Sequence, residues 1–282
     1  MSRPGLASCS LLTLAALLVA SPAAAQRESQ PATPPSAEEW LESCRRDGGW
    51  NDDDEAHCEV REYTIAAPSR LRVDAGANGG IRVRGTDRRD VFIRAKIRTH
   101  ARDAEAAREL ARELKIVTAG GDVRTDAPSG SLMRRRGWSV SYEIWVPRSM
   151  NLDLESTNGG VRIAEVRGTL DAETTNGGVH LTDVAGTVHA RATNGGITVQ
   201  IAQSRWEGTG LDAETTNGGV RVELPEQFNG RLEAETTNGG ITTDFPITLQ
   251  GRIGRRISTT LGQGGPLVRL STTNGGVQIR KR

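Results

Sequence analysis

The sequence has few aromatic residues, few cysteines and no charge excess of either sign. Its 5 Trp, 2 Tyr and 3 Phe among 282 residues argue against a large core packed from aromatic rings. A general nucleic-acid binder would carry a basic excess, whereas 36 basic and 35 acidic residues give a net charge of only +1. With 25% charged and 36% hydrophobic residues, wholesale disorder and a polytopic membrane protein are both disfavoured.

One long apolar run stands near the start of the chain. Residues 11–20 follow Arg3 and precede Ala23-Ala24-Ala25, which matches the small-x-small pattern that signal peptidases read. Ten helical residues span about 15 Å, too short for the membrane anchor that is the alternative reading. We therefore expect residues 1–25 to be a cleaved signal peptide. Residues 26–39 are expected to be a disordered, Pro-rich linker before a β-repeat domain over residues 40–282.

Two cysteines, Cys44 and Cys58, remain after the expected cleavage. An exported chain meets an oxidising environment, so the pair predicts a disulfide. The alternative is a metal site that includes His57 and the nearby acidic run, but the paired C-x-x-C spacing of zinc sites is missing. We expect no metal and no cofactor.

The main signal is an internal repeat. Asn-Gly-Gly begins at seven residues: Asn78, Asn158, Asn176, Asn194, Asn217, Asn238 and Asn274. From Asn158 onward the spacings are 18, 18, 23, 21 and 36, and the last suggests a degenerate copy near Arg256. Self-similarity at about 20 residues is typical of a solenoid.

Alignment on the asparagine shows that apolar or small residues recur in steps of two on both sides of it, as in Leu152, Leu154, Val161 and Ile163. This alternation predicts strands with one face inward, joined at Asn-Gly-Gly corners. The predicted fold is therefore all-β, a β-solenoid of 18–23-residue coils whose corner asparagines form a hydrogen-bonded ladder. A meander of hairpins is the alternative, because Asn-Gly is also a strong hairpin signal.

The chain before the regular coils of residues 148–282 is less periodic. Residues 58–147 are expected to form irregular first coils with an insertion that carries a helix at about 103–114, capped by Asp103. This insertion is predicted to cap the open end of the solenoid.

The segments CEVREYTIAAPSRLRVDAGANGGIRVRG and SVSYEIWVP and the serial T-N-G-G-V/I units resemble the bacterial exported putative-adhesin β-repeat family, a domain of unknown function. The resemblance covers about residues 58–282. It implies a β-solenoid at the cell envelope, and it supplies no catalytic residues. Members of that family often have Asp where this chain has the second glycine of a corner.

The outward positions predict a candidate binding surface for cations or basic partners. They form two mostly acidic columns, interrupted by His189 and Arg191: Asp153, Glu155, Asp171, Glu173, Asp212, Glu214, Glu233 and Glu235. Trp206, in a longer loop, is a candidate ligand anchor or a packing residue. Solvation of the face is the plainer interpretation of the columns.

The sequence thus predicts a non-catalytic exported envelope protein, an adhesin or binding scaffold without nucleic-acid partners, located in the periplasm, at the cell surface or in the medium. The alternatives are a self-associating envelope scaffold, structural or linked to stress responses, and a polysaccharide-active β-helix enzyme. The short turns leave little room for the cleft that such an enzyme needs.

Overall fold

A computed structural model describes residues 36–46, 54–127, 136–246 and 254–282. The expected signal peptide and most of the expected linker lie outside these residues. The helices and strands, in chain order, are α1 (Ala37–Arg46), β1 (Glu55–Ala66), β2 (Arg70–Asp74), β3 (Ile81–Thr86), β4 (Asp90–Ala101), α2 (Ala104–Glu113), β5 (Lys115–Val117), η1 (Ala119–Gly121), β6 (Asp122–Asp126), β7 (Gly137–Pro147), β8 (Asn151–Asn158), β9 (Val161–Ala164), β10 (Arg167–Asn176), β11 (Val179–Thr182), β12 (Ala185–Asn194), β13 (Ile197–Gln200), β14 (Gly210–Asn217), β15 (Val220–Leu224), β16 (Gly230–Asn238), β17 (Ile241–Thr243), β18 (Arg256–Leu261), β19 (Leu267–Asn274) and β20 (Val277–Lys281).

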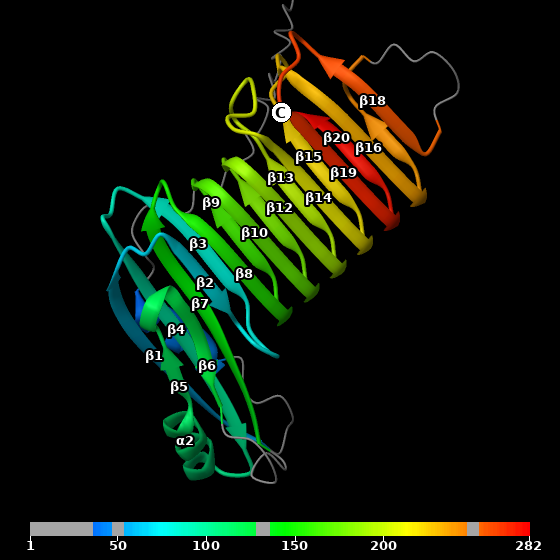
Figure 1. Ribbon diagram of the computed structural model, residues 1–282. Helices are drawn as coiled ribbons and strands as arrows, with labels where there is room; N and C mark the ends of the chain where they lie inside the picture. The colour runs from blue at the N-terminus through cyan, green and yellow to red at the C-terminus, as the bar shows by residue number, and fades with distance from the viewer. Residues whose placement is uncertain (1–35, 47–53, 128–135, 247–253) are drawn as a thin grey trace, which may run out of the picture. The chain divides into compact units, whose positions relative to one another are not determined.

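The strands form two sheets of ten strands each in the described part of the chain. Sheet A has the order β1-β4-β7-β3-β9-β11-β13-β15-β20-β17, and sheet B has the order β18-β16-β19-β14-β12-β10-β8-β2-β6-β5. From β8 to β15 the chain alternates between them, so that one strand of sheet B, a corner and one strand of sheet A make one coil (Figure 1). The inward side chains of both sheets share one buried core.

Neighbouring coils pair in parallel, with like residues opposite one another. Leu170 of β10 lies opposite Leu152 of β8 on one side and Val188 of β12 on the other, and all three are buried. In a hairpin meander, the two strands that flank a corner would pair with each other, whereas β8 pairs with β2 and β10. The predicted β-solenoid is therefore confirmed, and the meander is excluded.

The two glycines of a corner have different reasons to be glycine. A Cβ added at Gly177, the first glycine of its corner, would lie 2.2 Å from the carbonyl oxygen of Gly159 in the preceding coil. At Gly178, the second glycine, the nearest atom would be the carbonyl oxygen of Gly196 at 3.1 Å. Close approach of neighbouring backbones thus excludes any side chain at the first position, while the second is only tight.

The order of the coils departs from the order of the chain at the C-terminal end. The coil of β19 and β20 lies between the coil of β14 and β15 and the coil of β16 and β17. Asn274 therefore has a neighbouring corner on both sides, and Asn238 occupies the end position. Stacking in chain order would instead have put Asn274 at the end, with a neighbouring corner on one side only.

A reversal of the chain makes this order possible. The expected degenerate copy near Arg256 is not a coil, because Arg256 begins β18, which runs antiparallel to β16 at the edge of sheet B. This segment has no Asn-Gly-Gly corner to join the ladder. The turn that follows has Gly262 and Gly264 at φ of 55° and 77°, and it returns the chain to enter β19 on the inner side of β16.

Only part of residues 58–147 forms coils. β2 and β3 pair in parallel with β8 and β9, and β6 and β7 pair in parallel on their other side. β1 and β4 instead extend sheet A with antiparallel strands, which corrects the expectation of irregular coils throughout. Within the expected helical range, α2 begins after Asp103, whose carboxylate accepts the amide N–H of Ala106 (2.8 Å).

A disulfide joins Cys44 of α1 to Cys58 of β1, as the sequence predicts. The linker was expected to reach residue 39, but α1 begins at Ala37. The hydroxyl of Ser36 accepts the amide N–H of Glu39 (3.2 Å), and acidic residues in the first turn face the positive end of the helix dipole. These local contacts favour a helix directly after the Pro-rich segment.

Candidate binding surface

The corner asparagines form a continuous ladder of side-chain hydrogen bonds. The order along the ladder is Asn78, Asn158, Asn176, Asn194, Asn217, Asn274 and Asn238, and each amide after the first donates to the side-chain oxygen of the asparagine before it at 2.8 to 3.3 Å. Its direction is uniform, because Asn238 donates to Asn274 just as Asn274 donates to Asn217.

A second, interrupted ladder lies inside the corners. At five of them the residue two positions before the asparagine is a buried Ser or Thr, whose hydroxyl donates to the carbonyl oxygen of the first glycine in a neighbouring coil. Ala192 interrupts it at the corner of Asn194. Thr174 donates to Gly159 at 2.7 Å, and Thr215 donates to Gly195 at 2.7 Å. Together the two ladders fix the register of the coils, and therefore the positions of the outward side chains.

The outward side chains of sheet B form two columns that run across the strands. From β8 onward the outer column lies five residues before the asparagine of each coil, and register pairing adds Arg72 of β2. Its members are Arg72, Asp153, Asp171, His189, Asp212, Arg269 and Glu233. From β8 onward the inner column lies three residues before the asparagine of each coil, and register pairing adds Asp74 of β2 and Arg256 of β18. Its members are Asp74, Glu155, Glu173, Arg191, Glu214, Ser271, Glu235 and Arg256.

Resident arginines compensate much of the acidic charge. Arg70 lies 3.2 Å from Asp153 and 3.1 Å from Asp171. At the other end of the face, Arg269 lies 3.4 Å from Glu233, and Arg256 lies 3.8 Å from Glu235. Each of these exposed pairs contributes about 0–1 kcal/mol, so they relieve repulsion more than they stabilise the fold.

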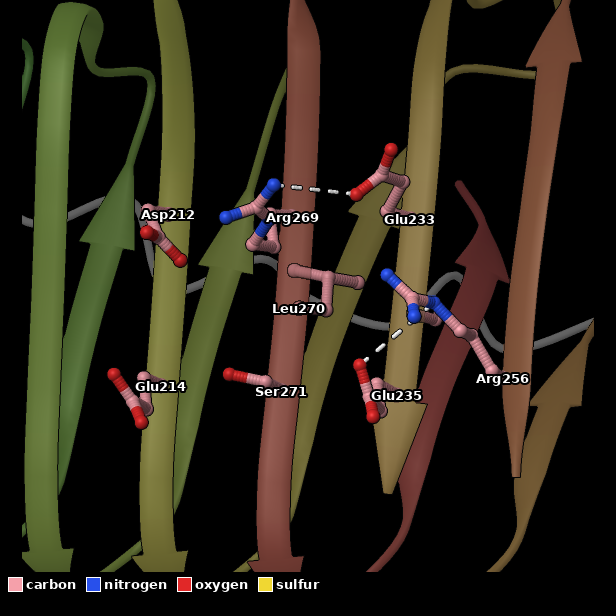
Figure 2. Close-up of a pocket in the computed structure, with 9 residues that line it drawn as sticks. Asp212, Glu214, Glu233, Glu235, Arg256, Arg269, Leu270 and Ser271 are labelled. Carbon is pink, nitrogen blue, oxygen red and sulfur yellow. Dashed lines mark hydrogen bonds and ion pairs between the residues drawn. The ribbon is translucent and has the colours of Figure 1, made fainter. Parts of the chain in front are cut away.

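The inner column has one position without a charge between two carboxylates. Ser271 of β19 lies between Glu214 of β14 and Glu235 of β16, and its short side chain leaves a depression of about 300 Å³ (Figure 2). Asp212, Glu233, Arg256 and Arg269 also line it. Asp212 and Glu214 make no ion pair with any residue that the structure describes, so the depression carries an acidic excess on its β14 side.

Trp206 is not part of this surface. Its side chain is 1% exposed, and its indole N–H donates to the carbonyl oxygen of Gly186 at 2.9 Å. The structure therefore corrects its role as a candidate ligand anchor. It is a core residue of the longer loop, and a buried indole needs such a hydrogen-bond partner.

The sequence analysis missed Arg269, Ser271 and Arg256, which shape the depression. Arg269 and Ser271 occupy the same repeat positions as Asp212 and Glu214, so the alignment could have identified them as column members. The alignment could not identify the neighbours of these residues, because the neighbours depend on the insertion of β19 between β14 and β16.

The described residues contain no group of three or more His, Cys, Asp or Glu side chains close enough to hold a metal ion. In the same residues, no helix is long and apolar enough to cross a membrane. The surface therefore presents exposed charged side chains in fixed register. In the inner column, Ser271 is the one uncharged position, and it lies between the carboxylates of Glu214 and Glu235.

These coils define the class of protein, a β-solenoid of parallel repeats. Residues 100–280 match the family described as Toastrack DUF4097, and the chain belongs to that family. This agrees with the resemblance to the putative-adhesin repeat family of unknown function. A comparison with curated proteins finds no match.

Among solved structures, the chain is similar to a putative cell adhesion protein from Clostridium sporogenes, with 13% identity, a TM-score of 0.40, and coverage of 81% of this chain and 100% of the other. It is also similar to a putative adhesin from Bacteroides fragilis, with 8% identity, a TM-score of 0.38, and coverage of 80% and 97%. A putative lipid binding protein from Parabacteroides distasonis has 9% identity, a TM-score of 0.30, and coverage of 79% and 96%.

Proposed function

We propose that this protein is a non-catalytic, exported binding scaffold of the adhesin type, and that it binds a cationic group of its partner in the depression at Ser271. The observation that carries the proposal is the sequence of charges in the inner column. Arg191 stands between Glu173 and Glu214, and Arg256 stands beside Glu235, but between Glu214 and Glu235 the chain supplies only Ser271.

A lysine or arginine side chain from outside would take the place that resident arginines hold elsewhere in the column. The unpaired carboxylates of Asp212 and Glu214 lie two residues apart on the outward face of β14, and they repel each other by roughly 0.5 kcal/mol in a water-like medium. A bound cation relieves this repulsion and gains charge-assisted hydrogen bonds. The ladders hold the surrounding strands in register, so the site needs little ordering when it binds.

Export is supported by the apolar run and the Ala23-x-Ala25 pattern, together with a disulfide in the folded domain. Mass spectrometry of the exported product tests it, and we expect a mature N-terminus at Gln26.

The binding site is tested with short lysine oligomers and the full mature chain. The double variant Asp212→Asn, Glu214→Gln removes the unpaired carboxylates with little change in volume, and we expect its affinity to fall roughly tenfold at low salt. The matched control is Glu42→Gln on α1, an exposed glutamate outside the two columns. Equal affinity of the double variant, the control and the wild type would contradict the proposal.

A further inference from the structure

The opposite face of the solenoid carries a row of the opposite charge. In sheet A, the residues four positions after each corner asparagine lie in register across the strands. They are Arg82, Arg162, His180, Thr198, Arg221, Gln278 and Thr242. The row contains three arginines and no carboxylate, so it contrasts with both columns of sheet B.

The arginines of this row have little anionic compensation. Arg82 lies 3.6 Å from Glu143, but that carboxylate also pairs with Lys96 and Arg94. Arg162 has no ion pair among the residues that the structure describes, and Arg221 donates only to the neutral Gln278 at 2.8 Å.

Arg82 and Arg162 are direct neighbours across β3 and β9, about 4.8 Å apart along the sheet. Like charges opposite each other on a sheet are destabilising. Burial and the charge of Arg162 together lower the pKa of His180, which agrees with a locally positive potential. An anion placed between these side chains would relieve the repulsion.

The corners beside the row add hydrogen-bond donors. A guanidinium nitrogen of Arg162 lies 3.8 Å from where a Cβ would stand on Gly160, and Nε2 of His180 lies 3.4 Å from the same point on Gly178. Each side chain therefore lies close to the second glycine of its own corner. The backbone N–H groups of these two glycines donate to no acceptor in the described part of the chain. A guanidinium beside free backbone N–H groups suits a sulfate, phosphate or carboxylate oxygen.

We propose that this row binds a linear acidic polysaccharide through Arg82, Arg162, His180 and Arg221. A polymer is favoured over a single oxyanion because the cationic positions run from β3 to β15, across five neighbouring strands and about 19 Å. Such a chain would lie across the strands, with its anionic groups over successive coils. The acidic columns on sheet B would repel the same polymer, so binding would be confined to sheet A.

The test uses the full mature chain and dextran sulfate, with uncharged dextran as the reference polymer. We expect binding to dextran sulfate that weakens with salt, and no binding to dextran. The double variant Arg162→Gln, Arg221→Gln should bind roughly tenfold more weakly or worse, because two charge-assisted contacts are lost. The matched control is Arg167→Gln in β10 of sheet B, an exposed arginine outside the row, whose affinity should stay within about twofold of wild type.

A second pair of variants places a carboxylate instead of removing a cation. Gly160→Asp adds one beside Arg162 and should weaken dextran sulfate binding, while Gly240→Asp adds one at the last corner, where no atom lies within 4 Å of the new Cβ, and should not. Melting temperatures of both variants serve as the control for folding.

Unchanged binding in the arginine double variant would overturn the proposal. So would tight binding to anionic phosphatidylglycerol vesicles without binding to dextran sulfate, which would identify a lipid surface. Inorganic phosphate is added at the same concentration of anionic groups as dextran sulfate. If it displaces the polymer, the row binds single oxyanions, and the proposal of a polysaccharide site is overturned. The proposed site on sheet B binds cations and is tested with lysine oligomers, whereas the row on sheet A is tested with dextran sulfate. A negative result in one test therefore does not decide the other.

Discussion

The side-chain amide of Asn238 donates to the side-chain oxygen of Asn274 at 2.9 Å, although Asn274 comes 36 residues later in the chain. Asn274 also donates to Asn217 at 2.8 Å. The coil that is last in sequence therefore lies inside the stack, and its insertion puts Ser271 between two glutamates.

The first prediction concerns the ladder. Asn274→Ala breaks hydrogen bonds on both sides, while Asn238→Ala breaks one at the end of the stack. We expect Asn274→Ala to lose about 1–2 kcal/mol of unfolding free energy, similar to Asn194→Ala in a middle coil, and Asn238→Ala to lose about half as much. Denaturant melts measure all three variants, and the largest loss at Asn238 would be incompatible with the observed order.

The second prediction concerns the C-terminal coil. Deletion of residues 267–282 removes β19 and β20, so β16 and β17 lose their parallel neighbours toward the stack. We expect the amides of β16 to β18 to lose most of their protection in hydrogen exchange, while those of β8 to β11 keep it. If β16 remained as protected as in the full chain, it would have to pair elsewhere.

The third prediction separates the two corner glycines. Gly177→Ala forces a Cβ to within 2.2 Å of a backbone oxygen, whereas Gly178→Ala meets one at 3.1 Å. We expect a loss of about 3 kcal/mol or more for Gly177→Ala, and about 1 kcal/mol or less for Gly178→Ala, in thermal or denaturant unfolding. Equally small losses of stability at both positions would show that the first glycine has more room than described.

These results show what the repeat alone could reveal. The alternation around each asparagine identified the inward residues, because a strand with one buried face has a period of two. The stacking order could not be read in the same way, since near-identical corners such as those at Asn217, Asn238 and Asn274 can all pair with one another. The burial of Trp206 was equally hidden, because an aromatic residue in a polar loop is compatible with packing or with binding.

The fourth prediction concerns pH. Burial raises the pKa of Tyr142 to about 12, from an ordinary value of 10.0. The raised pKa means that the stability contributed by the neutral phenol is fully present below pH 10 and is lost as the pH rises toward 12. The loss should reach roughly 2–3 kcal/mol.

The control for this prediction is Tyr142→Phe. It removes the titrating group together with the short hydrogen bond to Thr125 (2.6 Å), so its stability at neutral pH will also differ. The slope between pH 10 and 12 is the relevant quantity, and it should be flatter in the phenylalanine variant. Equal slopes in both proteins would show that Tyr142 does not titrate abnormally.

The most direct test of the central claim, that the inserted coil builds the depression, is cysteine cross-linking across sheet B. Glu214 and Ser271 are register partners on neighbouring strands, so cysteines at both positions lie within disulfide range. Glu214 and Glu235 are two strands apart, about 10 Å, although they would be neighbours if the coils stacked in chain order. After mild oxidation, mass spectrometry should find the 214–271 cross-link and no 214–235 cross-link. A 214–235 cross-link without the other would contradict the inserted coil and, with it, the proposed site.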